Sequence, residues 1–78
     1  MKKVTIYTTP VCVYCRAAKD FFKKNNISYE EYDVAADMVK RQEMFDKSGQ
    51  MGVPVITVDD QLIVGFNQPV LAKALGIK

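Results

Sequence analysis

The first 33 residues combine two strand patterns with one helix pattern, and this order constrains the fold more than any other feature. Residues 3–8 alternate apolar and polar side chains, as expected of a β-strand. Residues 13–25 place apolar side chains at spacings of three and four, which predicts an amphipathic helix. Strand character returns over residues 27–33. A strand, a helix and a strand in this order predict a parallel pair joined by a right-handed crossover.

The remaining residues predict a second helix, a hairpin and a final helix. The second helix starts at Asp33 or Asp37, two alternative capping residues, and stops at Ser48-Gly49. Two short apolar segments and a last helix follow: strands at 55–58 and 61–64 around a tight Asp59-Asp60 turn, then a helix from the cap Asn67 to Gly76. The order β-α-β-α-β-β-α predicts an α/β fold, in which helices flank a four-stranded mixed sheet. We expect one domain over residues 1–78.

Composition excludes several classes of function. A chain of 78 residues buries a thin core and has no room for a separate cofactor domain. The net charge of +2 comes without a polybasic segment, and no apolar run is long enough for a bilayer or a signal peptide. We therefore expect a cytoplasmic monomer that binds neither nucleic acid nor membranes. The absence of His excludes Cys-His and Ser-His hydrolases and zinc sites that need imidazole.

Cys12 and Cys15 form a C-x-x-C motif between the first strand and the first turn of the helix. The free N–H groups and partial positive charge of a helix N-terminus favour a thiolate there, and Arg16 and Lys19 add positive charge. We predict that Cys12 is the nucleophile and that Cys15, one turn inside the helix, is the resolving thiol. Two other interpretations stay open, namely a small structural disulfide and half of a metal site shared between two chains.

Val53-Pro54 lies directly before the third predicted strand. The simpler interpretation is that Pro54 only opens the strand, because its missing N–H is tolerated there. The alternative is a cis peptide bond beside which Val53 presents its backbone to an incoming disulfide-bonded peptide, as in strand addition.

Together these motifs resemble those of the thioredoxin-fold redoxins, and among them the glutaredoxins and the similar NrdH-type redoxins that reduce ribonucleotide reductase. The resemblance implies a thiol-disulfide oxidoreductase of thioredoxin fold that acts on protein disulfides and on mixed disulfides of glutathione. It implies glutathione as co-substrate and no bound cofactor. The resemblance covers essentially the whole chain, through Ile6-Tyr7-Thr8, Cys12-Val13-Tyr14-Cys15, Ser48-Gly49, Gly52-Val53-Pro54 and Val64-Gly65-Phe66.

The resemblance also implies a set of glutathione contacts. It places Tyr14 next to the thiolate, and the backbone of Val53, before Pro54, against the cysteinyl part of glutathione. It places Arg41 at the glycine carboxylate, which an arginine fork suits. The segment Gly65-Phe66-Asn67 occupies the position where the family binds the γ-glutamyl group. Arg41 as an exposed helix cation and Phe66 as a core residue are the alternative interpretations.

Some residues depart from the glutaredoxin pattern. Val13 stands where the family usually has Pro, and Phe66 follows Gly65 in the manner of NrdH-type redoxins, whereas Tyr14 stands where those tend to have Gln. Glutathione is therefore the first expected reductant, and a thioredoxin-reductase-type flavoprotein the second. In the second case ribonucleotide reductase is the expected partner. A third alternative is a dimer that bridges an iron-sulfur cluster through Cys12 and two glutathiones.

Overall fold

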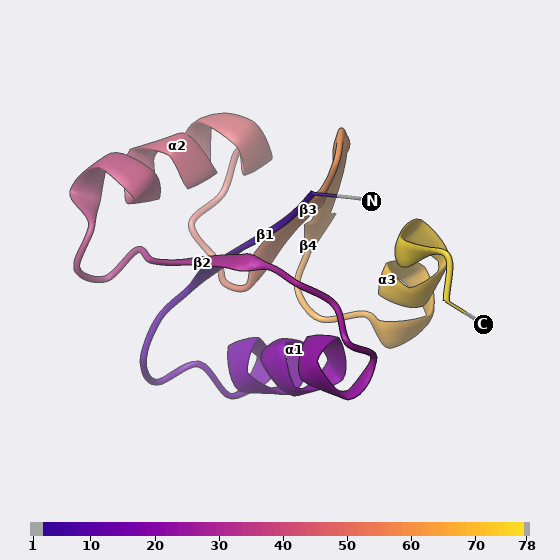
Figure 1. Ribbon diagram of the computed structural model, residues 1–78. Coiled ribbons are helices and arrows are strands. Elements are labelled where there is room, and N and C mark those ends of the chain that lie inside the picture. The colour runs from indigo at the N-terminus through magenta and orange to yellow at the C-terminus, as the bar shows by residue number, and fades with distance from the viewer. Residues whose placement is uncertain (1–2, 78) are drawn as a thin grey trace.

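The computed structural model describes residues 3–77, so residues 1–2 and 78 of the predicted domain lie outside the described residues. The predicted order of elements is confirmed (Figure 1). The helices have 8 to 12 residues, and none of them within residues 3–77 has the length and apolar character needed to cross a bilayer. The elements are β1 (Val4–Thr8), α1 (Val13–Lys24), β2 (Glu30–Asp33), α2 (Met38–Ser48), β3 (Val55–Val58), β4 (Gln61–Val64) and α3 (Gln68–Leu75).

The four strands form one sheet in the order β2-β1-β3-β4. β1 and β2 run parallel, with Thr8 opposite Asp33. β3 runs antiparallel to both of its neighbours, and its first residue, Val55, lies opposite Tyr7 of β1 and Val64 of β4. The predicted mixed sheet is therefore confirmed.

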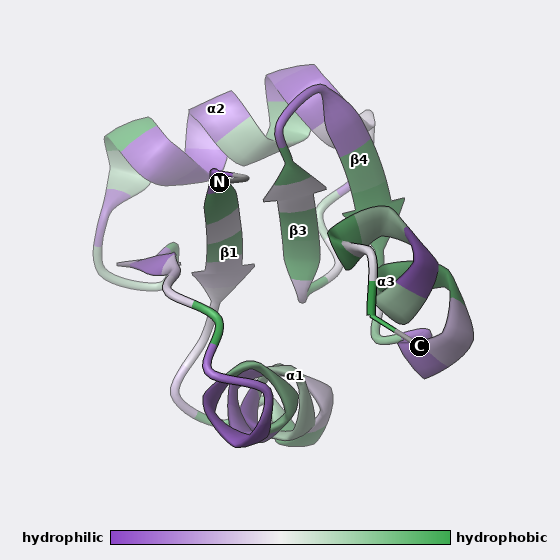
Figure 2. Cartoon of the chain, turned by 45° about the vertical axis from the view of Figure 1, so that its right-hand side comes forward, coloured by the Kyte–Doolittle hydropathy of each residue, from purple (hydrophilic) through white to green (hydrophobic). Residues whose placement is uncertain are grey.

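Helices cover both faces of this sheet. In Figure 2, α2 lies above the strands, α1 lies below β1, and α3 lies at the lower right, next to β4. On one face, Phe22 of α1 and Leu71 of α3 are fully buried in a cluster with Ile6 and Ile56. On the other face, Met44 of α2 is fully buried. All five residues of β1 are buried as a result, although their sequence alternates apolar and polar side chains.

Each helix begins at a residue whose side chain accepts a backbone hydrogen bond. Cys12 caps α1, Asp37 caps α2 and Asn67 caps α3. Asp37 accepts from the N–H groups of two following residues, which satisfies donors that a helix start leaves free. Asp33 instead accepts from the N–H of Ala35 in the preceding turn. The second of the two predicted starts of α2 is therefore the correct one.

β2 begins three residues later than predicted, at Glu30. Glu30 is the first residue of β2 that pairs with β1, and it lies opposite Thr5. The N–H of Ile27 donates instead to the carbonyl of Phe22 at 2.8 Å and closes the end of α1. The apolar residues before Glu30, Ile27 and Tyr29, are partly buried and pack against the core rather than pairing with β1.

The β3–β4 connection is the predicted two-residue turn, Asp59-Asp60, with Asp59 in a left-handed conformation (φ 53°). This turn is tied to the start of β1 by two hydrogen bonds. The N–H of Lys3 donates to Oδ1 of Asp59 at 2.8 Å, and the N–H of Asp59 donates to the carbonyl of Lys3 at 2.9 Å. The first residue of the described chain is therefore held at one end of the sheet.

Candidate active site

The sheet register brings three chain segments to the opposite end of the sheet. β1 ends at Thr8, and its antiparallel partner β3 begins beside it at Val55. β4 runs antiparallel to β3 and ends at Val64, opposite Val55. The segments that follow Thr8, precede Val55 and follow Val64 therefore lie at the same end, although they are far apart in sequence. They carry the C-x-x-C motif, Val53-Pro54 and Gly65, which are three of the predicted site segments.

Cys12 and Cys15 are joined by a disulfide at the start of α1, with their Cα atoms 5.2 Å apart. The Sγ of Cys12 accepts a hydrogen bond from the N–H of Cys15 at 3.0 Å. The first turn of α1 carries no acidic residue, so no charge within it opposes the positive end of the helix dipole at this sulfur. Cys15 is 1% exposed, whereas Cys12 is only half-buried. An approaching group therefore reaches Cys12 first.

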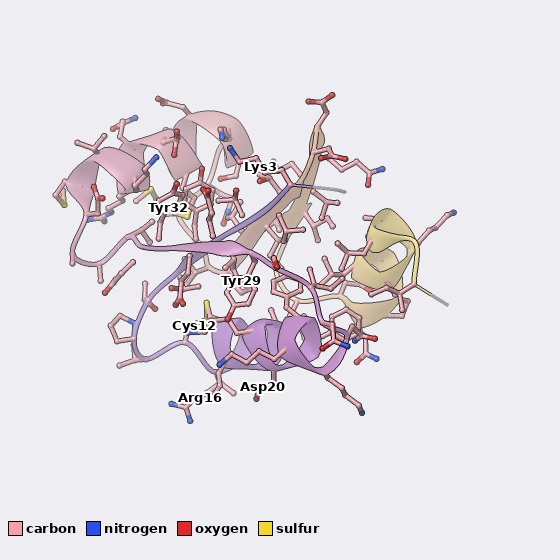
Figure 3. All side chains as sticks on the ribbon, in the orientation of Figure 1. Lys3, Cys12, Arg16, Asp20, Tyr29 and Tyr32 are labelled. Atoms are coloured by element: carbon pink, nitrogen blue, oxygen red, sulfur yellow. A yellow bond between two sulfur atoms is a disulfide. The ribbon has the colours of Figure 1, made fainter. Side chains whose placement is uncertain are left out.

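The two cations predicted to stabilise the thiolate lie in different surroundings. Arg16 is exposed and extends from α1 away from Cys12 (Figure 3). The Nζ of Lys19 forms an ion pair with Oε2 of Glu31 at 2.8 Å. The charge of Lys19 is therefore partnered by a carboxylate, which reduces its field at a thiolate. The thiolate-stabilising roles of Arg16 and Lys19 stay predictions.

The Val53-Pro54 peptide bond is cis, which confirms the second of its two interpretations as far as the bond is concerned. Pro54 is fully buried, and its carbonyl accepts a hydrogen bond from the N–H of Gly65 at 2.7 Å. Gly65 has a φ of 83°, a conformation that residues with a Cβ rarely adopt. Val53 stays partly exposed. The hydrogen bond between Gly65 and Pro54 therefore connects two of the segments predicted to bind glutathione.

Phe66 and Asn67 have structural roles in this fold. Phe66 packs against the hydrophobic core, and its ring meets the ring of Phe21 edge-on at a centroid distance of 6.1 Å. Its interpretation as a core residue is confirmed. Oδ1 of Asn67 accepts from the N–H of Val70 at 3.3 Å, as predicted for the cap of α3. A contact of either residue with glutathione stays a prediction.

Exposed apolar side chains flank Cys12. Val11, Val13 and Tyr14, which we call the active-site collar, are 89%, 76% and 66% exposed. Apolar side chains exposed together beside a reactive sulfur offer a surface to a partner. Arg41 lies on α2 and is exposed, as its alternative interpretation expects. It lines a hollow together with Met38, Gln42, Phe45 and Met51.

Thr8 and Glu31 are not among the site residues predicted from the sequence. Thr8 is 2% exposed, and its Oγ1 donates to Oε2 of Glu31 at 3.0 Å, the same oxygen that Lys19 binds. The hydrogen bond from Lys19 is the main reason why the pKa of Glu31 lies below its ordinary value, and the bond from Thr8 lowers it further. The sequence does contain a signal for Thr8, because the alternation of β1 places this polar residue on the same face as the apolar Val4 and Ile6.

Comparison with known proteins supports the redox role that the geometry of Cys12 and Cys15 indicates. Residues 4–63 match the family model described as Glutaredoxin. An uncharacterized glutaredoxin-like 8.6 kDa protein in the rubredoxin operon of Clostridium pasteurianum is 43% identical over 72 residues, which cover 92% of this chain and 96% of that relative. Glutaredoxin 3 of Escherichia coli (strain K12) is 38% identical over 65 residues, which cover 83% of this chain and 78% of the relative.

Solved structures show the same fold. A mutant of the thioredoxin-like protein BC3987 matches with a TM-score of 0.92 and 33% identity, and the match covers both chains completely. NrdH-redoxin from Escherichia coli matches with a TM-score of 0.79 and 25% identity, covering 91% of this chain and 92% of that one. The predicted thioredoxin fold is therefore confirmed. The chain belongs to the glutaredoxin family, and it is a thiol-disulfide oxidoreductase whose redox pair is Cys12 and Cys15.

Proposed function

We propose that the protein reduces protein disulfides and mixed disulfides of glutathione, with glutathione as its reductant and without a bound cofactor. One observation carries this proposal: Cys12 is half-buried at a helix N-terminus, while Cys15, one turn further along the helix, is buried. Dithiol exchange needs one sulfur that outside groups reach and a second that reacts only within the molecule. The similarity to glutaredoxin 3 supports glutathione as the small thiol.

The cycle starts from the reduced dithiol. The Cys12 thiolate attacks one sulfur of the substrate disulfide, a new S–S bond forms to Cys12, and the other substrate sulfur leaves and takes up a proton. Cys15 then loses its proton to solvent and attacks the sulfur of Cys12. The Cys12–Cys15 disulfide forms and the remaining substrate thiol departs. Two molecules of glutathione return this disulfide to the dithiol and leave as oxidised glutathione, which balances the two electrons.

Four of the predicted contact residues suit a glutathionyl substrate in this proposal. Tyr14 of the active-site collar lies against the glutathionyl group beside Cys12. The backbone of Val53 pairs with its cysteinyl part, in the manner of an added strand. The exposed guanidinium of Arg41, in the hollow with Met51, receives its glycine carboxylate. Gly65, whose N–H donates to the carbonyl of Pro54, offers its segment to the γ-glutamyl group.

A second candidate function is reduction by a thioredoxin-reductase-type flavoprotein, with ribonucleotide reductase as the electron acceptor. The observation that favours it is the similarity to the E. coli NrdH-redoxin, a glutaredoxin-like protein described as having a thioredoxin-like activity profile. Val13 between the cysteines and Phe66 after Gly65 agree with this candidate, because the NrdH-type redoxins share both features.

Two coupled reactions distinguish the candidates. The oxidised protein is given NADPH with glutathione and glutathione reductase in one reaction, and NADPH with thioredoxin reductase in the other. We expect NADPH to be consumed faster with glutathione. Consumption with the flavoprotein alone would replace the first candidate by the second.

Serine variants test the roles of the two cysteines. We expect Cys12→Ser to lose all disulfide reduction, because no nucleophile remains. We expect Cys15→Ser to keep part of the activity on glutathione mixed disulfides, because a second glutathione resolves the intermediate. Retained disulfide reduction in Cys12→Ser would contradict the proposal for either reductant.

A further inference from the structure

One carboxylate connects the two ends of the redox segment. Oε2 of Glu31 accepts hydrogen bonds from Oγ1 of Thr8 at 3.0 Å and from Nζ of Lys19 at 2.8 Å. Thr8 is the last residue of β1 before the loop to Cys12, and Lys19 lies one helical turn beyond Cys15. The strand before the motif and the helix after it are therefore held by the same oxygen atom.

The ion pair between Lys19 and Glu31 lies on the side of α1 that carries Cys15. Residues four apart share a helix face, so Lys19 and Cys15 are neighbours on α1. Cys15 and Phe22 are buried, which shows that this face is turned toward the sheet. The side chains of Lys19 and Glu31 are 27% and 39% exposed, so water shields the pair incompletely. One charge of each sign therefore lies near the resolving thiol.

Several other charged groups of α1 and β2 differ from this pair in partner or in orientation. Lys23 lowers the pKa of Glu31 less than Lys19 does. Arg16 and Asp20 point away from the sheet in Figure 3. The other two acids of β2 are bound locally, and β1 contributes the uncharged Thr8. Those two acids are Glu30, which accepts from the hydroxyl of Tyr32, and Asp33, which accepts from the N–H of Ala35.

We propose that the Glu31–Lys19 pair keeps the net charge near Cys15 close to zero, and that this balance sets how readily Cys15 loses its proton and how fast it resolves the mixed disulfide. This inference rests on the proposed function. Glu31 is a positioning residue that holds the ammonium group of Lys19 against β2, so that the two opposite charges largely cancel at Cys15. In the step concerned, the Cys15 thiolate bonds to the sulfur of Cys12, the bond from Cys12 to the substrate sulfur breaks, and the substrate leaves as a thiolate.

Removing either partner leaves the other charge uncompensated. Glu31→Gln leaves a cation, which favours the Cys15 thiolate, whereas Lys19→Met leaves a carboxylate, which disfavours it. A single charge one to two helical turns away, in surroundings between water and protein interior, shifts an ionisation by about half to one pH unit. A purely structural role predicts otherwise, because both variants break the same ion pair and would change the reaction in the same direction.

Release of thiol from 5,5′-dithiobis(2-nitrobenzoate) in a stopped-flow instrument measures the step. The reduced protein releases one equivalent of coloured thiolate when Cys12 attacks, and a second when Cys15 resolves the intermediate. The pH midpoint of the second phase reports the ionisation of Cys15. We expect this midpoint to fall by about half to one unit in Glu31→Gln and to rise by a similar amount in Lys19→Met. At a pH below the midpoint, the second phase then changes about three- to tenfold, with opposite signs.

Lys40→Met is the matched control, because Lys40 and Glu43 form an ion pair of similar exposure on α2, at 3.2 Å. We expect it to leave the midpoint unchanged, and Lys19→Arg, which keeps the charge, to behave like the wild type. Shifts of the same sign in the two neutral variants, or no shift, would overturn the proposal. If one neutral variant fails to fold, the direction in which the other shifts the midpoint, relative to Lys19→Arg, decides. A wild type without a second phase would overturn the proposed function instead.

Discussion

Replacing Tyr7 by Phe removes a single hydroxyl from the interface between the sheet and α2. Tyr7 is 1% exposed, and its hydroxyl donates to Oε2 of Glu43 at 2.9 Å and accepts from Nζ of Lys47 at 3.3 Å. Burial and the bond to Glu43 raise the pKa of Tyr7 above its usual value, so the hydroxyl carries its proton at neutral pH. A Phe ring keeps the packing against Tyr32, at a centroid distance of 5.8 Å. The variant therefore isolates the hydroxyl.

The expected loss of stability follows from these contacts. A hydrogen bond to a charged group contributes about 1.5–3 kcal/mol. The side chain of Glu43 is 36% exposed, so water replaces part of the lost bond, and we reduce the expected loss to about 1 kcal/mol. In a chain of this size, such a loss lowers the Tm by about 4–8 °C.

The loss of stability in Tyr7→Phe depends on pH. The hydrogen bond from Tyr7 is the main reason why the pKa of Glu43 lies below its ordinary value of 4.5. A carboxyl whose pKa is lowered by folding stabilises the protein above the unfolded value, and this contribution disappears as the pH falls through the folded value. The difference between wild type and Tyr7→Phe is therefore complete at neutral pH and shrinks in acid.

Urea unfolding at neutral pH and at about pH 3 measures both effects. Tyr32→Phe is the matched control, because its hydroxyl bonds to the exposed Glu30 at 2.9 Å, and we expect a smaller loss for it. A loss in Tyr7→Phe no greater than that in Tyr32→Phe, or one equal at the two pH values, would refute this reasoning.

Three further predictions concern the core, a helix cap and a turn. Phe22→Ala removes a fully buried ring and is expected to cost about 3–5 kcal/mol in urea unfolding, with a smaller loss for Phe45→Ala, whose ring is 42% exposed. Asn67→Ala removes the cap of α3 and is expected to lower the free energy of unfolding by about 1 kcal/mol. Asn67→Ser, which keeps a capping oxygen, is expected to lose less. Gly65→Ala meets no atom within 4 Å of the new Cβ, so its expected cost of about 1 kcal/mol is conformational. Thermal unfolding measures it, and Gly65→Asn is expected to lose less.

Those parts of the fold that depend on neighbouring residues were predictable from the sequence. Asp37 and Gly49 mark the two ends of α2 through contacts within a few residues. The Asp59-Asp60 turn connects the two strands of the hairpin in the same local way. The burial of Tyr7 was not predictable in this way, because its alternation pattern suits a sheet with one exposed face. It is buried because α2, more than thirty residues later in the chain, covers the second face.

The same distinction applies to the active site. The position of Cys12 at the start of a helix follows from the local pattern, and so does its greater exposure relative to Cys15. The partner of Lys19 does not, because Glu31 lies on another element and is brought near only by the packing of α1 against β2. A cation counted along one helix therefore overestimates the positive charge that a nearby sulfur experiences.

The two ends of the sheet differ in a way that is useful for attaching a label. The disulfide lies at one end of the strands, while Lys3 and the Asp59-Asp60 turn are tied together at the other. The five residues of β1 separate these ends by about 17 Å. Asp60 is exposed and takes no part in the bonds between Lys3 and Asp59. A fluorophore, an affinity handle or a linker to an electrode placed there keeps Cys12 facing the solution.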